Sequence, residues 1–178
     1  MTPLHPSQVG RCHKKRTVLL VGEGPMEWAF LRHVVQLFTD RSGPVAARPD
    51  NAHGGSPETI IQTARKLLRQ RAFDVCVILM DTDVPWPVSR PSHIGGTRVE
   101  YLTAAPCLEG LLLRIVGHTG ITTASTVDEC KRALYDNYVD RSHRTESQAY
   151  TRAFPKDLLL RRRGAVAQLD ALLKELEG

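Results

Sequence analysis

The sequence contains few cysteines and no long apolar run. Its four cysteines form no C-x-x-C pair, which argues against both a zinc site and a disulfide framework. We expect Cys76 and Cys107 to be small core residues. No segment approaches the roughly 20 apolar residues that a membrane span requires, and the amino-terminal residues lack the apolar core of a signal peptide. We therefore expect no membrane association and a cytoplasmic location.

Several motifs of common enzyme classes are also missing. The chain has no Walker motif, and Gly22-Glu-Gly24 does not match the dinucleotide-binding fingerprint. Ser56 lacks the Gly-x-Ser-x-Gly context of a hydrolase nucleophile. These absences argue against a P-loop nucleotidase, a dinucleotide-dependent enzyme and a serine hydrolase.

What the sequence does contain is typical of a globular domain with a basic character. Its 178 residues are 42% hydrophobic with a formal charge of +5, which favours one domain of residues 17–178 preceded by a basic arm, residues 1–16. The positive charge is clustered, and clusters of this kind favour polyanions. We take the candidate nucleic-acid-binding residues to be Lys14, Lys15, Arg16, Arg161, Arg162 and Arg163, with solvated termini as the simpler interpretation.

The apolar pattern predicts alternating strands and helices. Strands are expected at 17–21, 45–48, 74–80 and 99–102, and helices at 25–38, 57–68, 106–116, 127–138 and 165–176. We expect residues 89–96 to form an irregular substrate loop and residues 140–151 to be polar and mobile. This order predicts an α/β fold, Rossmann-like, with a mostly parallel central sheet of about four strands and helices on both faces.

Acidic residues follow two of the predicted strands. Glu23 lies between two glycines after the first strand, and Asp81 and Asp83 follow the third. In a doubly wound sheet these two strands are neighbours, so the three acids are expected to meet at the carboxyl ends. On an extended tip, residues two apart point the same way. Repulsion between the carboxylates is usually relieved by a divalent cation such as Mg²⁺.

Simpler interpretations exist for each acid taken alone, because aspartates are common in the turns that end strands. A receiver-like module phosphorylated on Asp81 or Asp83 is a further alternative. Such a module needs a lysine after a later strand, and the sequence has none between Lys66 and Lys131.

The arrangement of these segments resembles the TOPRIM domain of topoisomerases, primases and OLD nucleases. The matching segments are Val18 to Glu27 and Asp81-Thr-Asp83. His53-Gly-Gly-Ser-Pro57, Phe73-Asp74 and Ala105 to Leu113 are further similar to the RloB-like branch of bacterial TOPRIM proteins. Leu108 and Gly110 depart from that branch, in which aromatic residues flank the acid. The resemblance covers roughly residues 17–116.

The resemblance implies roles for the acids. Asp81 and Asp83 would bind Mg²⁺, with Mn²⁺ as a substitute, and Glu23 would act as general acid/base or as a further ligand. Glu27 matches a second metal-binding glutamate of the OLD nucleases, although an acid in the first turn of a helix also simply complements the helix dipole. Glu109 belongs to the branch motif and is either a cleft residue or an exposed helix residue.

His53 is a candidate of another kind. It precedes two glycines, so it could contact phosphate together with the free amides of the following helix, or could serve only the turn.

Together these features predict a metal-dependent nuclease of TOPRIM type. By the same resemblance, phage defence is the expected setting, with a partner protein encoded nearby as a further possibility. The alternative is a TOPRIM adaptor that binds nucleic acid or a protein without cleaving it.

Overall fold

A five-stranded sheet forms the centre of the protein in the computed structural model, which describes residues 14–83, 85 and 90–177. The strand order is β2-β1-β3-β5-β4. Strands β2, β1, β3 and β5 are parallel, and β4 is antiparallel to β5. The strands are β1 (Arg16–Gly22), β2 (Val45–Asn51), β3 (Val75–Asp81), β4 (His93–Ile94) and β5 (Thr97–Ala104). The predicted α/β class with a mostly parallel sheet is confirmed, with one strand more than predicted.

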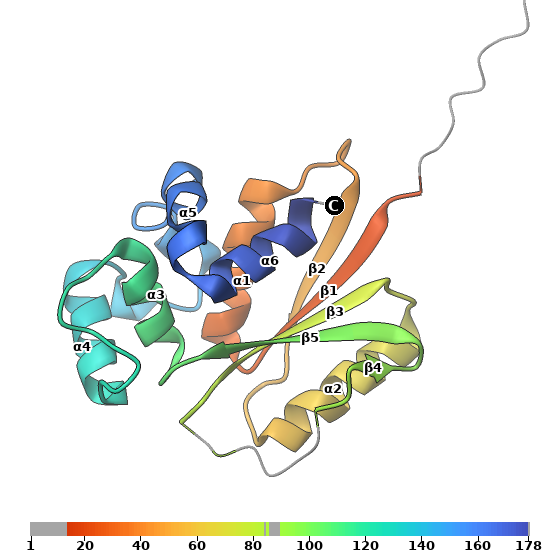
Figure 1. Cartoon of the computed structure of the whole chain (residues 1–178), viewed down its shortest axis with the longest axis horizontal. Helices are drawn as coiled ribbons and strands as arrows, with labels where there is room; N and C mark the ends of the chain where they lie inside the picture. The colour runs from red at the N-terminus through yellow and green to blue at the C-terminus, as the bar shows by residue number, and fades with distance from the viewer. Residues whose placement is uncertain (1–13, 84, 86–89, 178) are drawn as a thin grey trace, which may run out of the picture.

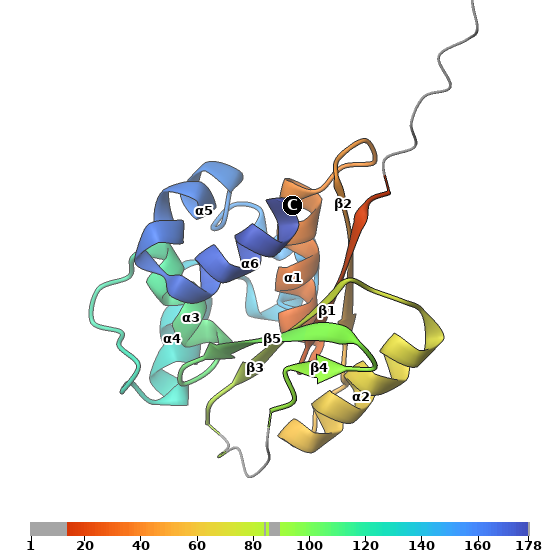
Figure 2. The same cartoon turned by 45° about the vertical axis from the view of Figure 1, so that its right-hand side comes forward.

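Helices cover both faces of the sheet (Figures 1 and 2), as predicted. Among the described residues, α2 is the helix on one face, and α1 and α6 lie on the other. The α-helices are α1 (Pro25–Phe38), α2 (Pro57–Gln70), α3 (Leu108–Val116), α4 (Val127–Asn137), α5 (Lys156–Arg162) and α6 (Ala167–Glu177). Among the described residues, none of these helices is both long and apolar enough to cross a bilayer.

Strand β1 divides the hydrophobic core between the two faces. Its residues point alternately to opposite sides of the sheet. Val18 and Leu20 pack in the larger cluster with α1, α3 and α6, whereas Leu19 and Val21 pack in the cluster with α2. All four side chains are fully buried, which explains the continuous apolar run of this strand. Cys76 and Cys107 are also buried core residues with free thiols, as predicted.

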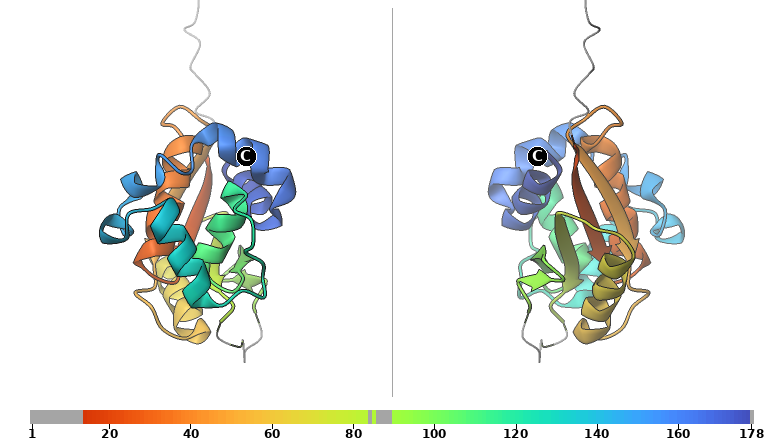
Figure 3. Two further views of the ribbon diagram at one scale, coloured as in Figure 1. Left: turned by 90° about the vertical axis from the view of Figure 1, so that its left-hand side faces the viewer. Right: turned by 90° about the vertical axis from the view of Figure 1, so that its right-hand side faces the viewer.

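The parallel pairing of β1 with β3 positions the candidate acids. Gly22, the last residue of β1, is paired with Leu79 near the end of β3. The predicted adjacency of the first and third strands is therefore confirmed. Helices α3 and α4 lie side by side and come to the front when the molecule is turned through 90° (Figure 3, left).

The strand that was not predicted is β4, which lies inside the segment that was predicted to be an irregular loop. Ile94 pairs with Thr97 across Gly95 and Gly96, both of which have positive φ (56° and 85°). A two-residue Gly-Gly turn of this kind matches the twist of a β-hairpin, because glycine adopts positive φ without steric cost. The loop prediction for residues 89–96 was therefore wrong at its end, and the Gly-Gly pair was the signal that could have revealed the hairpin.

Three predicted strands are longer in the structure, β1 by one residue at each end and β2 and β5 by more. β2 extends to Asn51 rather than residue 48, although it contains Pro49. Proline is tolerated there because β2 is at the edge of the sheet, where backbone N–H groups need no partner strand. β5 spans Thr97–Ala104 rather than 99–102, and its residues 98–104 pair with the whole of β3.

Residues 140–151 form ordered structure, contrary to the prediction of a mobile segment. They contain two 3-10 helices, η1 (Arg141–His143) and η2 (Ser147–Tyr150). Tyr150 is fully buried against Phe30, with ring centroids 5.9 Å apart, and its hydroxyl donates to the Arg144 carbonyl at 2.8 Å. The polar composition of this segment does not indicate its ordered structure, because a single buried aromatic residue, Tyr150, provides the packing.

Candidate functional site

Glu23 lies in a very tight turn between β1 and α1. A Cβ atom on Gly22 would lie 2.5 Å from Glu27 Cβ and 2.9 Å from the Trp28 nitrogen, so only glycine allows this approach. The Glu23 backbone N–H donates to the Leu79 carbonyl at 3.2 Å, and the Glu23 carboxylate accepts from the Asp81 backbone N–H at 3.3 Å. The turn therefore holds the Glu23 carboxylate over the end of β3.

Asp81 is the last residue of β3 and the most perturbed acid of the group. Its Oδ1 atom is buried and has no hydrogen-bond partner among the residues that the structure describes. Burial, followed by the charges of nearby carboxylates, raises the pKa of Asp81 to about 9. The contributing carboxylates are, in decreasing order, Glu27, Glu23, Glu109 and Asp83. Asp81 is thus a partly buried acid within electrostatic reach of four others.

Asp83 is exposed whereas Asp81 is partly buried, and the chain between them is bent rather than an extended tip as expected. The chain bends after Asp81, because the Thr82 N–H donates to the carbonyls of both Ala104 (3.1 Å) and Pro106 (3.2 Å). Asp83 is exposed as a result. Its charge still raises the pKa of Glu23, for which burial is the larger cause. Asp83 therefore lies at the open edge of the acid cluster.

Glu27 has a structural contact as well as a place in the cluster. It lies in the first turn of α1, and its Oε2 accepts from the Gly24 backbone N–H at 2.9 Å. Its side chain is buried, and that burial, together with the charges of Glu23 and Glu109, raises its pKa to about 7 although two backbone hydrogen bonds oppose the rise. Both expected roles, complementing the helix dipole and reaching a metal ion, are compatible with this position.

Glu109 is buried rather than exposed, and it faces the same cluster. It lies in the first turn of α3, where only 3% of its surface is accessible. Its Oε1 accepts from the Tyr135 hydroxyl of α4 at 2.9 Å, and that hydroxyl also contacts Met26 Sδ at 3.1 Å. Burial and the Glu109 charge raise the pKa of Tyr135, so the phenol remains a donor. Tyr135 is a site residue that sequence reasoning missed.

We call Glu23, Glu27, Asp81, Asp83 and Glu109 the acid cluster. Among the described ranges, no three His, Cys, Asp or Glu side chains stand ready to hold a metal ion. Three of the five carboxylates are instead bonded to donors of the protein: Glu23 to the Asp81 N–H, Glu27 to the Gly24 N–H and Glu109 to Tyr135. The atoms that could bind a metal ion are all carboxylate oxygens, and Asp81 Oδ1 has no hydrogen-bond partner among the described residues. Both features fit a hard cation such as Mg²⁺ or Mn²⁺.

His53 lies next to the acid cluster but is not part of it. Its side chain is exposed, its backbone has a positive φ of 60°, and its N–H donates to Asn51 Oδ1 at 2.8 Å. The following residue, Gly54, donates its N–H to the Glu23 carbonyl at 2.8 Å. The contacts of this segment are therefore those of a turn that supports Glu23.

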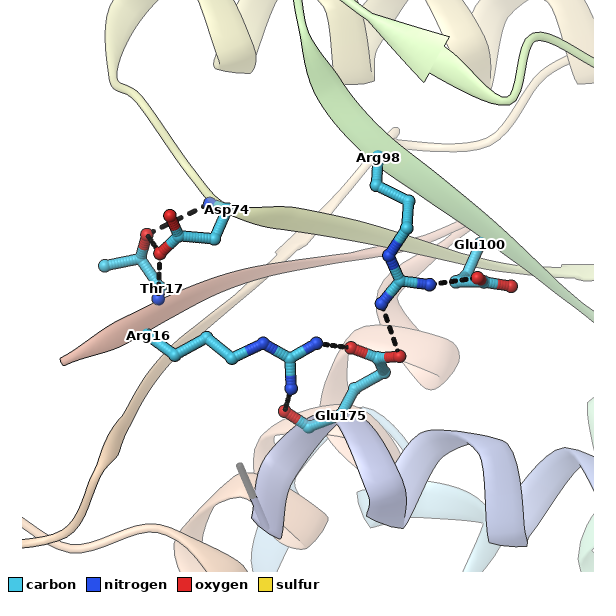
Figure 4. A network of polar contacts seen from close by, with 6 residues as sticks. All are labelled: Arg16, Thr17, Asp74, Arg98, Glu100 and Glu175. Carbon is cyan, nitrogen blue, oxygen red and sulfur yellow. Dashed lines mark hydrogen bonds and ion pairs between the residues drawn. The ribbon is translucent and has the colours of Figure 1, made fainter.

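Several of the predicted nucleic-acid-binding residues are occupied in structural contacts at the amino end of the sheet. Figure 4 shows Glu175 of α6 between Arg16 of β1 and Arg98 of β5, bonded to both. Each strand rises about 3.3 Å per residue. The seven residues of β1 thus separate Arg16 from Gly22 by about 20 Å, so Arg16 is remote from the acids.

The second basic run is also largely bound to the protein. Arg162 donates to the carbonyls of Arg114 (2.9 Å) and Ile115 (3.0 Å), where it completes the end of α3. Arg163 pairs with Asp170 and Glu177.

The remaining predicted basic residues are more open. Lys14 and Arg161 are exposed, while the Lys15 ammonium contacts the Arg41 carbonyl. Residues 1–13 of the predicted arm lie outside the described residues. The structure therefore supplies structural partners for Arg16, Arg162 and Arg163, and brings none of the six to the acid cluster.

Comparisons of the chain with protein-family models, with curated proteins and with solved structures give no match.

Proposed function

We propose that this protein cleaves phosphodiester bonds of nucleic acid in a reaction that depends on Mg²⁺, with Mn²⁺ as a substitute. The observation that carries the proposal is the buried, unpaired Oδ1 of Asp81 among four further carboxylates at the carboxyl ends of parallel strands. A bound cation would neutralise this charge and polarise the scissile phosphate. The sequence resemblance to TOPRIM nucleases supports the same activity and a cytoplasmic role in phage defence.

Within this proposal, the five acids have different tasks. Asp81 and Asp83 are the principal ligands of the cation, because Asp81 carries the unpaired oxygen and Asp83 is open to solvent. Glu27 and Glu109 complete the negative site from α1 and α3.

Glu23 has a different task, because burial raises its pKa and so favours a carboxyl group that can hold and release a proton. It therefore acts as the general acid/base, or as a further ligand if its carboxylate turns from the Asp81 N–H.

The second candidate function is a non-catalytic adaptor that binds nucleic acid or a protein encoded nearby. It is favoured by the engagement of three of the five carboxylates with donors of the protein, so that the described residues present no ready set of metal ligands. An adaptor would retain the acid cluster as a structural or binding feature without turnover.

One experiment separates the two functions. Single- and double-stranded DNA and RNA are incubated with the protein in Mg²⁺, in Mn²⁺ and in EDTA, and metal binding is measured by calorimetry. We expect metal-dependent cleavage of at least one substrate, lost in Asp81→Asn. Metal binding or nucleic-acid binding without cleavage would favour the adaptor, and cleavage that persists in Asp81→Asn would remove the acid cluster from the reaction.

A further inference from the structure

A pocket with a basic rim opens directly beside the acid cluster. It has a volume of ≈ 600 Å³ and lies between α4, the start of α3 and the η1 segment. Glu109 and Tyr135, which hydrogen-bond to one another, are among its lining residues. Because Glu109 also belongs to the acid cluster, the pocket and the cluster share a wall.

Four cations surround this opening, and we call it the basic pocket. Lys131 and Arg132 come from α4, and Arg141 and Arg144 come from the segment that follows it. All four are exposed, and within residues 14–83, 85 and 90–177 none of them makes an ion pair. The two acids that line the pocket, Glu109 and Asp128, leave an excess of two positive charges (four cations less two anions).

The basic rim is built on ordered structure rather than on a loose loop. The Arg141 guanidinium lies 5.1 Å from the centroid of the Tyr135 ring, a cation–π contact. The Arg144 side chain donates to the Arg141 carbonyl at 2.6 Å, and the Arg144 carbonyl accepts from the buried Tyr150 hydroxyl. The cations of this segment are therefore held at the mouth of the pocket before any ligand binds.

We propose that the basic pocket binds the phosphate backbone of a single nucleic-acid strand and directs the adjacent phosphodiester to the acid cluster. This proposal rests on the proposed function and names the form of its substrate. Unpaired cations attract phosphates and release counterions when they bind them. A volume of ≈ 600 Å³ is in the range of small-molecule sites, so it accommodates a nucleotide unit of one strand and is too small for a duplex.

The test measures binding in EDTA, where no metal-dependent cleavage occurs. Fluorescence anisotropy compares single-stranded DNA, single-stranded RNA and a duplex of equal length, over a range of salt concentrations. The variants are Lys131→Ala/Arg132→Ala and Arg141→Ala/Arg144→Ala. The matched control is Lys66→Ala/Arg69→Ala, which removes two exposed cations from α2 on the opposite face of the sheet. Circular dichroism and thermal unfolding verify that each variant is folded.

We expect each pocket variant to bind a single strand about tenfold more weakly than wild type, with a shallower salt dependence, while the control changes by less than about twofold. Equal effects of the pocket and control variants, or tighter wild-type binding of the duplex than of either single strand, would overturn the proposal. If wild type passes this binding test but cleaves nothing in Mg²⁺ or Mn²⁺, the proposed nuclease function fails and the pocket assignment stands.

Discussion

The carboxylate of Glu23 accepts a hydrogen bond from the backbone N–H of Asp81, with 3.3 Å between Oε2 and the nitrogen. This contact joins the turn after β1 to the end of β3, across 58 residues of sequence. It places a group suited to proton transfer beside the acid with the unpaired oxygen. The roles of Glu23 and Asp81 can therefore be separated by substitutions that preserve side-chain size.

Glu23→Gln retains the shape of the side chain and its ability to accept a hydrogen bond, but cannot exchange a proton. If Glu23 is the general acid/base, metal affinity should be retained while cleavage falls by a factor of ~10²–10⁴. Calorimetry and single-turnover cleavage at saturating metal provide the two measurements. Loss of metal affinity together with activity would show that Glu23 is a ligand, and a wild-type rate would refute both roles.

Asp81→Asn removes the most perturbed charge of the acid cluster. We expect the variant to lose Mg²⁺ binding and, in EDTA at pH 8, to be more stable than wild type by about 1 kcal/mol, which corresponds to ~2–4 °C in Tm. The gain arises because wild type must retain a proton on Asp81 or accept the repulsion of four neighbouring carboxylates. Asp136→Asn, an exposed acid on the same protein, serves as the control and should change neither property.

The stability of the metal-free protein should depend on pH in a defined direction. The folded-state pKa values of Glu27 (about 7) and Asp81 (about 9) exceed the values of roughly 4 expected for the unfolded chain. Between these limits the folded protein holds protons that the unfolded protein has released. The free energy of unfolding should therefore fall as pH rises from about 4, first through the Glu27 range and then through the Asp81 range.

Urea unfolding in EDTA at several pH values between 5 and 9 measures this dependence. Asp81→Asn should remove most of the decrease above pH 8, because Glu27, with a pKa of about 7, is mostly ionised there. A stability that rises over this range in wild type would contradict the pKa shifts.

Arg16→Ala should weaken the fold rather than nucleic-acid binding. Glu175, whose side chain is only 14% exposed, would lose one of its two arginine partners. We expect a loss of about 1 kcal/mol in the free energy of unfolding, because the Arg16–Glu175–Arg98 contacts form a network rather than an isolated surface pair. Lys14→Ala is the matched control, since Lys14 is exposed nearby, and should leave stability unchanged. If Arg16→Ala changed the free energy of nucleic-acid binding more than the free energy of unfolding, the nucleic-acid role predicted from the sequence would be restored.

The sequence was sufficient to predict that Glu23 and Asp81 meet. Each follows an apolar strand, and the order of crossovers in an α/β fold makes β1 and β3 neighbours. The bend that leaves Asp83 exposed was not predictable in the same way. It depends on the donation of the Thr82 N–H to Ala104 and Pro106, which come from a strand and turn far along the chain.

The rest of the site depends on contacts between helices that leave no local pattern. Tyr135 and Glu109 are 26 residues apart and meet only because α3 packs on α4. The contacts of the basic residues are equally hard to predict from sequence. A run of arginines has the same pattern whether its members face solvent or, like Arg162, hydrogen-bond to the end of a helix.

The contact between Gly22 and Glu27 has a consequence for how a cation can reach the acids. Behind Glu27 the backbone of β1 lies so close that even one methyl group would overlap it, which leaves no room for a water molecule. Water and cations therefore cannot reach Glu27 through the side that Gly22 closes, and its carboxylate lies among the charges of Glu23 and Glu109. A counterion has to approach Glu27 from another side.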